Sequence, residues 1–194
     1  MLDQLIHFFE RHVELSEVEI QYMKDRVPIK KVKKNCILLA AGEVSQAFYF
    51  ILEGSIRLYY DVEAVEKTAF FYFENTFVSS YESFTRQIPA KHNLKTIEET
   101  KVAVISAEVA MELVSKFPKF EFLARIMMEE ELIVYQEIIS SFITLNAEQR
   151  YLKLLEDNHP ILQRIPQHQL ATYLGVTAET LSRIRKRIGR SSIS

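Results

Sequence analysis

The stretch 48-FYFILEGSIRLYY-60 decides the fold class of this chain. It contains two short runs of aromatic and β-branched residues on either side of Glu53-Gly54, and runs of this composition are typical of β-strands. Glycine reaches the positive φ that a tight turn requires, so we expect the two strands to form a hairpin. Several such runs are apolar on both strand faces, which predicts sheets that pack around a closed interior.

Further strand-like runs lie between Ile29 and Ile105. The clearest are CILLA (36–40), TAFFYF (68–73) and KVAVI (101–105). Turn-forming residues separate them, and many short strands at close spacing are typical of a β-sandwich or barrel. We therefore predict an N-terminal jelly-roll-like β-roll, also described as a double-stranded β-helix.

Helical patterns flank the β-rich region. Residues 1–27 repeat apolar side chains at helical spacing, and Ser16 with Glu19 has the pattern of a capping box at a helix start. A second helical segment follows the last strand. The fold class is therefore α+β, and we assign residues 1–116 to a β-roll sensor domain with flanking helices.

Residues 119–145 contain neither glycine nor proline and predict one long helix. Its apolar residues recur at spacings of three, four or seven, and they are Phe120, Leu123, Met127, Val134, Ile138, Phe142 and Leu145. This stripe has two interpretations, because it can pack against the chain's own domain or join two copies in a parallel dimer. We assign residues 117–145 to a dimerisation helix and expect a homodimer.

The C-terminal segment, residues 146–194, predicts a helical unit. The stretch 170-LATYLGVTAETLSRIRKR-187 contains two helical patterns separated by Gly175, a residue type that commonly ends a helix. Three apolar residues share one face of the second helix, namely Leu181, Ile184 and Ile188. Two helices joined by such a short turn form a helix-turn-helix, whose second helix can enter the major groove of DNA.

The charge distribution agrees with a nucleic-acid partner. The whole chain has a formal net charge of −2 at pH 7, yet residues 146–194 hold eight Lys/Arg and four Asp/Glu. A basic unit on an acidic body predicts contact with a polyanion. Glu179 and Arg183 lie on the polar face of the last helix and are suited to the edges of cytosine and guanine. Thr177 and Thr180 lie at its start, where phosphate contacts are made.

The order of these parts resembles the Crp/Fnr family of transcription regulators. The segment 40-AAGEVSQAFYFILEGSIRLYY-60 is similar to paired strands of the family's cyclic-nucleotide-binding roll. The segment 170-LATYLGVTAETLSRIRKR-187 is similar to its recognition helix. The resemblance covers almost the whole chain, and it implies a dimeric regulator that binds an inverted repeat in double-stranded DNA.

The resemblance implies specific DNA contacts. Glu179 and Arg183 match two base-reading positions of the family, whereas Ala178 stands where the family has an arginine, which argues against the usual guanine-rich half-site. Only four residues follow Arg190, so we expect the family's winged hairpin to be absent or shortened. The predicted DNA-binding set is Thr177, Ala178, Glu179, Thr180, Ser182, Arg183 and Lys186.

The ligand-binding motifs of the family are replaced in this chain. In its cyclic-nucleotide binders a Gly-Glu pair holds the ribose and an Arg-Ser pair holds the phosphate, whereas Ser79-Ser80 and Ala90-Lys91 lie at or near these places here. Alanine cannot replace the bidentate phosphate contacts of arginine. We therefore expect an unknown small-molecule effector other than cyclic AMP, or none. The candidate effector residues are Ser79, Ser80, Tyr81, Glu82, Arg86 and Lys91.

The composition argues against other classes of protein. No apolar run approaches a membrane span and the N-terminus lacks a secretory signal, so we expect a cytoplasmic protein without a membrane partner. The single cysteine, Cys36, excludes a disulfide framework and an iron–sulfur cluster, and we expect it to be a small buried strand residue. The histidines form no metal-binding motif and no catalytic constellation is present, so neither an enzyme nor a cofactor is expected.

Two other functions agree with parts of the sequence. A roll-fold enzyme or small-molecule-binding protein would use the C-terminal helices only as structural elements. An adaptor for protein interactions would bind no DNA duplex even at low salt. A DNA-binding regulator would instead be dimeric, and its affinity for DNA would fall steeply with salt.

Overall fold

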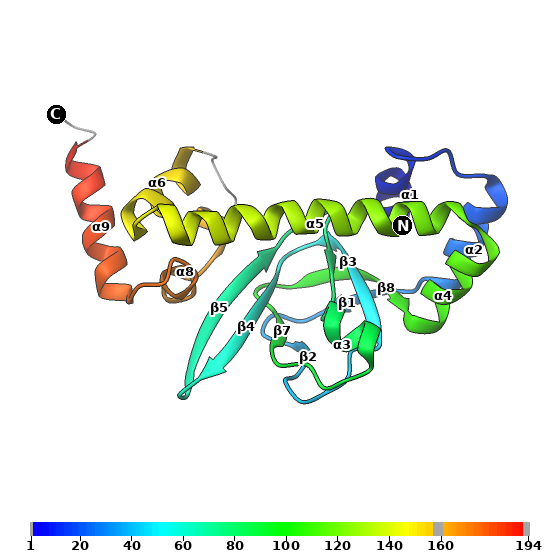
Figure 1. The fold of residues 1–194 in the computed structure, drawn as a ribbon, viewed down its shortest axis with the longest axis horizontal. Helices are drawn as coiled ribbons and strands as arrows, with labels where there is room; N and C mark the ends of the chain where they lie inside the picture. Colours follow the sequence, from blue (N-terminus) through cyan, green and yellow to red (C-terminus); the bar gives the residue numbers. More distant parts are fainter. Residues whose placement is uncertain (1, 157–160, 192–194) are drawn as a thin grey trace.

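The computed structural model describes residues 2–156 and 161–191. The helices are α1 (Asp3–Glu10), α2 (Glu17–Arg26), α3 (Tyr81–Arg86), α4 (Ala107–Lys116), α5 (Lys119–Thr144), α6 (Ala147–Glu156), α7 (Ile161–Arg164), α8 (Gln167–Tyr173) and α9 (Ala178–Ser191). The strands are β1 (Ile29–Val32), β2 (Ile37–Leu39), β3 (Ala47–Glu53), β4 (Ile56–Val62), β5 (Val65–Tyr72), β6 (Phe77–Val78), β7 (Asn93–Thr96) and β8 (Thr100–Ser106). Helix α5 runs along the roll, with α1, α2 and α4 at one of its ends and α6, α8 and α9 at the other (Figure 1).

The strands of the described residues form two four-stranded sheets. The strand orders are β1-β8-β3-β6 and β2-β7-β4-β5, and neighbouring strands are antiparallel. Apolar side chains from both sheets meet in one core cluster, in which Ile51, Ile56, Leu94 and Val102 are completely buried. The predicted β-roll with helices is therefore confirmed.

The predicted hairpin across Gly54 is wrong. Strand β3 pairs with β6 and β8, whereas β4 pairs with β5 and β7, so the turn between β3 and β4 carries the chain from one sheet to the other. Gly54 does have a positive φ, of 95°, and a Cβ at this position would lie 2.6 Å from the carbonyl oxygen of Glu99. The close approach of the backbone at this corner therefore requires glycine.

The hairpin in this part of the roll joins β4 to β5 instead. Its two turn residues, Glu63 and Ala64, both have positive φ values, of 52° and 62°. Glycine, asparagine and aspartate are the residues that usually adopt this geometry. Because neither turn residue is of these types, the local sequence gives no indication of the turn.

Helix α5 packs one face against the chain's own roll. Phe120 and Leu123, which belong to the predicted apolar stripe, are buried with residues of α1, α2, α4, β3 and β8, and Met127 packs against the same cluster. The first interpretation of the stripe, packing within the chain, is therefore correct for the N-terminal half of the helix. Val134 and Phe142, from the C-terminal half of the predicted stripe, are exposed instead, as are five apolar residues outside the stripe, namely Phe122, Leu132, Ile133, Ile139 and Ile143.

Cys36 is exposed, so the prediction that it is a buried strand residue is wrong. It lies just before β2, and its backbone N–H donates to Oγ1 of Thr96 at 2.9 Å. The roll therefore uses the backbone of Cys36 and leaves its side chain outside the core. A short apolar run such as CILLA does not reveal at which residue its strand begins.

The predicted capping box at the start of α2 is present. The N–H of Ser16 donates to Oε2 of Glu19 at 2.7 Å, and the N–H of Glu19 donates to Oγ of Ser16 at 3.4 Å. Lys119 also binds Oε2 of Glu19 at 3.0 Å, which joins α2 to the start of α5. Burial of the carboxyl group raises the pKa of Glu19, but the hydrogen bonds from Ser16 and Lys119 outweigh it and leave that pKa below its ordinary value of 4.5.

Replacement of this carboxylate will destabilise the protein at neutral pH. We expect Glu19→Gln to lower the free energy of unfolding by about 1–2 kcal/mol, because hydrogen bonds to a charged group are lost. Since the pKa of Glu19 is lower in the folded state, its contribution is present above pH 4.5 and disappears as the pH falls through the folded-state pKa. Urea unfolding across this pH range measures the effect. Glu17→Gln, an exposed change in the same helical turn, is the control, and an equal loss in both variants would contradict the account.

Candidate functional site

Helices α8 and α9 form a fixed pair at the end of the molecule. The turn between them is closed by the N–H of Val176, which donates to the carbonyl oxygen of Ala171 at 3.0 Å. Gly175 has a φ of 72°, as expected for the residue that follows a helix. The predicted apolar contacts are confirmed, since five side chains of the pair are at most 5% exposed, namely Leu170, Ala171, Leu174, Leu181 and Ile184.

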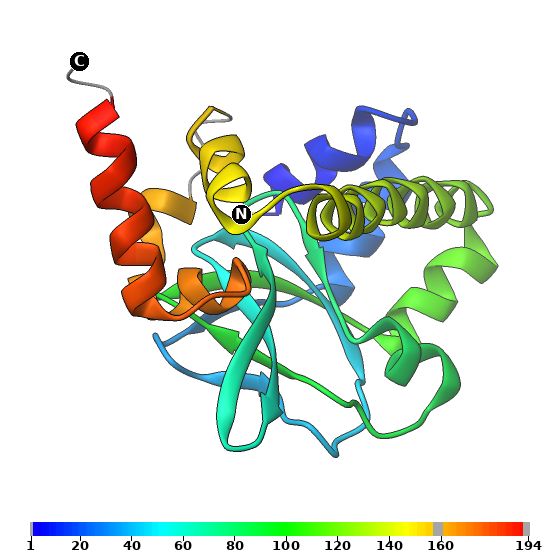
Figure 2. The same cartoon turned by 60° about the vertical axis from the view of Figure 1, so that its left-hand side comes forward.

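The polar side of α9 faces away from this core. Ala178, Glu179, Arg183 and Lys186 are exposed, whereas Thr180 and Ser182 are partly buried. In both views α9 lies at the edge of the molecule, and it runs across the direction of α5 in Figure 1, while Figure 2 shows that no other element covers its outer side. The predicted DNA-binding residues of α9 therefore lie together on an accessible surface.

Hydrogen bonds organise the start of this surface. Oγ1 of Thr177 accepts the N–H of Thr180 at 3.2 Å, so Thr177 caps the helix. Arg183 donates to Oγ1 of Thr180 at 3.1 Å, one helical turn away. Backbone and Thr177 hydrogen bonds lower the pKa of Glu179, which keeps its carboxylate ionised. Acceptor and donor groups therefore stand side by side at the N-terminal end of α9.

Part of the basic charge in the C-terminal segment is used within the protein. Arg187 forms an ion pair with Glu148 of α6, in which its Nε donates to Oε1 at 2.8 Å. The side chain of Arg190 lies outside the described residues, and so do residues 192–194, on which the prediction about the winged hairpin falls. Arg185 and Lys186 are exposed. Part of the basic charge of α9 therefore serves the packing of α6 against α9.

Arg150 was not identified from the sequence, although it holds the C-terminal unit to α5. It donates to the carbonyl oxygens of Leu145 at 2.6 Å and Leu174 at 2.8 Å. Its guanidinium carbon lies 4.3 Å from the centre of the Phe142 ring. Arg150 thus joins the end of α5 to the turn between α8 and α9, and only the folded arrangement reveals this role.

A cavity of about 370 Å³ lies between the β4–β5 hairpin, the segment 79–92 and α5. Five of the six predicted effector residues line it, namely Ser79, Ser80, Tyr81, Glu82 and Lys91. Arg86 does not line this cavity, and its assignment as an effector contact stays a prediction. Arg86 ends α3 and turns outward, where its side chain is 70% exposed and pairs with Glu82 at 3.1 Å.

The walls of the cavity are mainly aromatic and aliphatic. Tyr60, Phe70 and Tyr135 contribute rings from β4, β5 and α5, outside the segment that contains the predicted effector residues. The ring of Phe70 stands edge-on to Tyr135, with 5.4 Å between centroids. Burial raises the pKa of Tyr135, so its hydroxyl stays neutral, and it donates to Glu131 at 2.7 Å.

The charged side chains at the cavity wall, Lys91 and Glu82, form an ion pair. Lys91 lies 3.5 Å from Glu82 and is 74% exposed, so its ammonium group is largely in solvent. His92 is neutral, because burial lowers the pKa of its imidazole. Its Nε2 atom is buried and has no hydrogen-bond partner among the described residues. The cavity is therefore lined mainly by rings and aliphatic groups, and it holds no buried cation among its described lining residues.

The roll matches a known domain family, and the chain as a whole is similar to known regulators. Residues 29–117 match the family model of the cyclic nucleotide-binding domain. The chain is 25% identical to the regulatory protein HlyX of Actinobacillus pleuropneumoniae, over 92% of this chain and 79% of that protein. It is 27% identical to the fumarate and nitrate reduction regulatory protein of Vibrio cholerae serotype O1, over 92% and 76%. Over almost its whole length the chain is therefore similar to transcription regulators of the Crp/Fnr family.

Solved Crp/Fnr structures share the fold at low sequence identity. A crp/fnr family transcriptional regulator from Eubacterium rectale has a TM-score of 0.73 and 16% identity, over 91% of this chain and 85% of that chain. The c-di-GMP responsive regulator CLP of Xanthomonas campestris also has a TM-score of 0.73, with 17% identity over 91% and 93%. At these identities the likeness concerns the fold alone, and it does not select an effector for the chain described here.

The described residues contain no group of three or more His, Cys, Asp and Glu side chains that could hold a metal ion. None of their helices combines the length and hydropathy that a membrane-spanning helix needs.

Proposed function

We propose that this chain acts as a homodimer that binds an inverted repeat in double-stranded DNA. In this proposal residues 1–116 are the sensor domain, 117–145 the dimerisation helix and 146–194 the DNA-binding domain, in which α8 and α9 are the helix-turn-helix. One observation carries the proposal: the polar side of α9 is exposed opposite an apolar side that α8 buries. A helix held in this way can enter a major groove without unfolding.

In this proposal some residues of the helix contact base edges and others contact phosphates, according to the chemistry of their side chains. Arg183 can donate to O6 and N7 of guanine, and Glu179 can accept from the amino group of cytosine. Thr177 and Thr180, at the start of the helix, are suited to phosphate oxygens, as are Ser182 and Lys186. Ala178 offers only a methyl group, which favours contact with the methyl group of thymine or no base contact at all.

The proposed dimer uses the exposed apolar residues of α5. Leu132, Ile139 and Ile143 are exposed by 56%, 59% and 78%, and they follow one another at spacings of seven and four residues. Such a repeat on a long helix is typical of the seam between two parallel helices. A second copy would bury these side chains and bring two α9 helices to the same end of the assembly.

The proposed effector cavity is the one beside Tyr135 and segment 79–92. Its aromatic walls favour an uncharged molecule that carries a ring. A cyclic nucleotide is disfavoured, because Ala90 provides no charge and Lys91 is paired with Glu82 in solvent.

The base-reading role of Arg183 can be tested by selecting bound duplexes from a random pool. We expect an inverted repeat to be enriched, and Arg183→Ala to weaken binding to it by about 1–3 kcal/mol and to relax preference at one base pair of each half-site. Lys24→Ala removes an exposed charge from α2 and serves as the control. Unchanged affinity and preference in Arg183→Ala would contradict the proposed readout.

The dimer seam can be tested with Leu132→Glu together with Ile139→Glu. Four buried carboxylates would be forced together in the dimer, so we expect the variant to have the mass of a single chain, 22.7 kDa, in light scattering. Its affinity for the inverted repeat should fall at least about 100-fold, because two linked half-site contacts become one. The control is Val18→Glu with Met111→Glu, which changes two apolar residues of similar exposure on α2 and α4. If the variant Leu132→Glu with Ile139→Glu remained dimeric, the proposed seam would be contradicted.

Cyclic AMP will not bind the cavity with useful affinity. We expect titration calorimetry to detect no saturable heat with the wild-type protein, because no unpaired cation is available for the phosphate. The matched variant is Lys91→Ala. Saturable binding to the wild type that this variant abolishes would show that Lys91 leaves Glu82 to hold a phosphate, and would contradict the expectation.

A further inference from the structure

The C-terminal helices are docked on the outer side of strand β5. The N–H of Thr68 donates to Oγ1 of Thr172 at 3.3 Å, and that hydroxyl donates to Oγ1 of Thr68 at 3.0 Å. The rings of Phe71 and Tyr173 lie 5.3 Å apart. Phe71 and Ile97 of the roll share one core cluster with the buried residues of α6 to α9. The roll and the C-terminal unit are therefore packed as one body.

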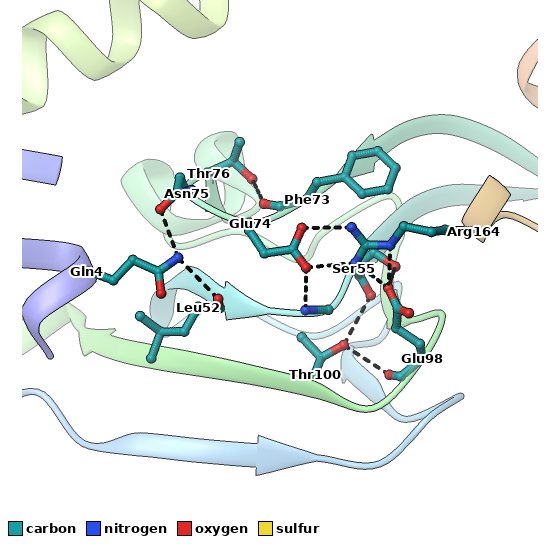
Figure 3. Close-up of polar contacts among 11 residues, drawn as sticks. Gln4, Leu52, Ser55, Phe73, Glu74, Asn75, Thr76, Glu98, Thr100 and Arg164 are labelled. Atoms are coloured by element: carbon teal, nitrogen blue, oxygen red, sulfur yellow. Dashed lines mark hydrogen bonds and ion pairs between the residues drawn. The ribbon is translucent and has the colours of Figure 1, made fainter. Parts of the chain in front are cut away.

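Arg164, at the end of α7, adds a charged clamp beside this core. Its Nη1 and Nη2 atoms donate to the two carboxylate oxygens of Glu74, each at 2.8 Å. Nη2 also donates to Oε1 of Glu98 at 2.5 Å, and Nε donates to the same oxygen at 3.1 Å. The guanidinium carbon lies 5.1 Å from the ring centre of Phe73 (Figure 3). We call this group, Arg164 with Glu74 and Glu98, the Arg164 latch.

The roll holds both carboxylates of the latch in place. The N–H of Gly54 donates to Glu74 at 2.8 Å, and Oγ of Ser55 donates to Glu98 at 2.7 Å (Figure 3). Hydrogen bonds from Arg164 lower the pKa of Glu74, so the carboxylate stays charged at neutral pH. The turn between β3 and β4 thus holds Glu74 and Glu98 in positions where they accept the hydrogen bonds of Arg164.

The docked arrangement leaves the DNA-binding residues free. Neither the latch nor the hydrogen bonds to β5 use an exposed polar residue of α9, and α9 lies at the outer edge of the molecule (Figure 1). Docking therefore sets the orientation of α9 relative to α5 without covering its polar side. In a dimer joined through α5, this orientation determines the separation of the two recognition helices.

We propose that the Arg164 latch presets the DNA-binding orientation, so that the protein is competent to bind DNA without an effector. This inference rests on the proposed DNA-binding function. An unlatched unit would sample other orientations, and the measured affinity falls in proportion to the fraction of molecules in the competent one. The latch raises that fraction before any DNA is present.

The test uses the double variant Glu74→Gln with Glu98→Gln in the full chain. For this variant the change in net charge and the loss of the latch predict opposite effects on DNA affinity. Removing two negative charges from the roll should leave DNA affinity unchanged or raise it, if electrostatics alone operates. Loss of the latch should instead weaken binding to the selected inverted repeat about tenfold, since charged hydrogen bonds that fix the orientation are lost. Affinities are measured without ligand at one salt concentration.

Two controls separate the latch from folding and from net charge. Glu10→Gln with Glu108→Gln removes the same charge from exposed positions of α1 and α4 and should not change the affinity. Hydrogen exchange should show faster exchange of the Thr68 amide in the latch variant. The amide of Leu181, which is bonded to Thr177 within α9, should stay protected, which shows that the unit is folded.

Each outcome of the binding experiment has one meaning. Ligand-free binding by the wild type that is weaker only in the latch variant supports the inference. Equal or tighter binding by the latch variant overturns it and leaves the DNA-binding function standing. Enrichment of a duplex only after a cell metabolite extract is added also overturns it, because an effector is then required. Enrichment under neither condition overturns the proposed function itself.

Discussion

The two-sided packing of strand β5 is the constraint on which the rest of this structure depends. Phe70 lines the cavity beside segment 79–92 and meets Tyr135 of α5, whereas its neighbour Phe71 meets Tyr173 of the C-terminal unit. The pairing of β5 with β4 shifts at Ala69, and such a bulge redirects the side chains on its two sides. Any molecule that moved Phe70 would therefore act on the strand that supports the C-terminal helices.

Two arginines hold the C-terminal unit in this packing. Arg150 joins it to α5, and Arg164 joins it to the roll. On the cavity side of β5, Ala90 carries no charge and Lys91 pairs with Glu82, so this wall presents no unpaired cation. The fold is shared with other regulators, but these side chains belong to this chain.

Local patterns predicted those parts of the structure that depend on neighbouring residues. Ser16 and Glu19 are three positions apart and form the expected capping box, and the buried sides of α8 and α9 follow the helical period. The sheet assignment of β4 was not predictable, because an apolar run does not specify its partner strand. The latch joins Arg164 to Glu74 across ninety residues of sequence, and pairs this distant leave no periodic pattern.

Small-angle neutron scattering tests the central claim, that the C-terminal unit binds DNA in its docked orientation. The wild-type dimer is measured free and on its selected duplex, in a water mixture that makes the DNA invisible. We expect the radius of gyration and the distance distribution of the protein to be the same in both states, because the docked roll, α5 and α9 move as one body. A clear change in the protein's distance distribution on DNA would contradict the account, since the unit would then have left strand β5.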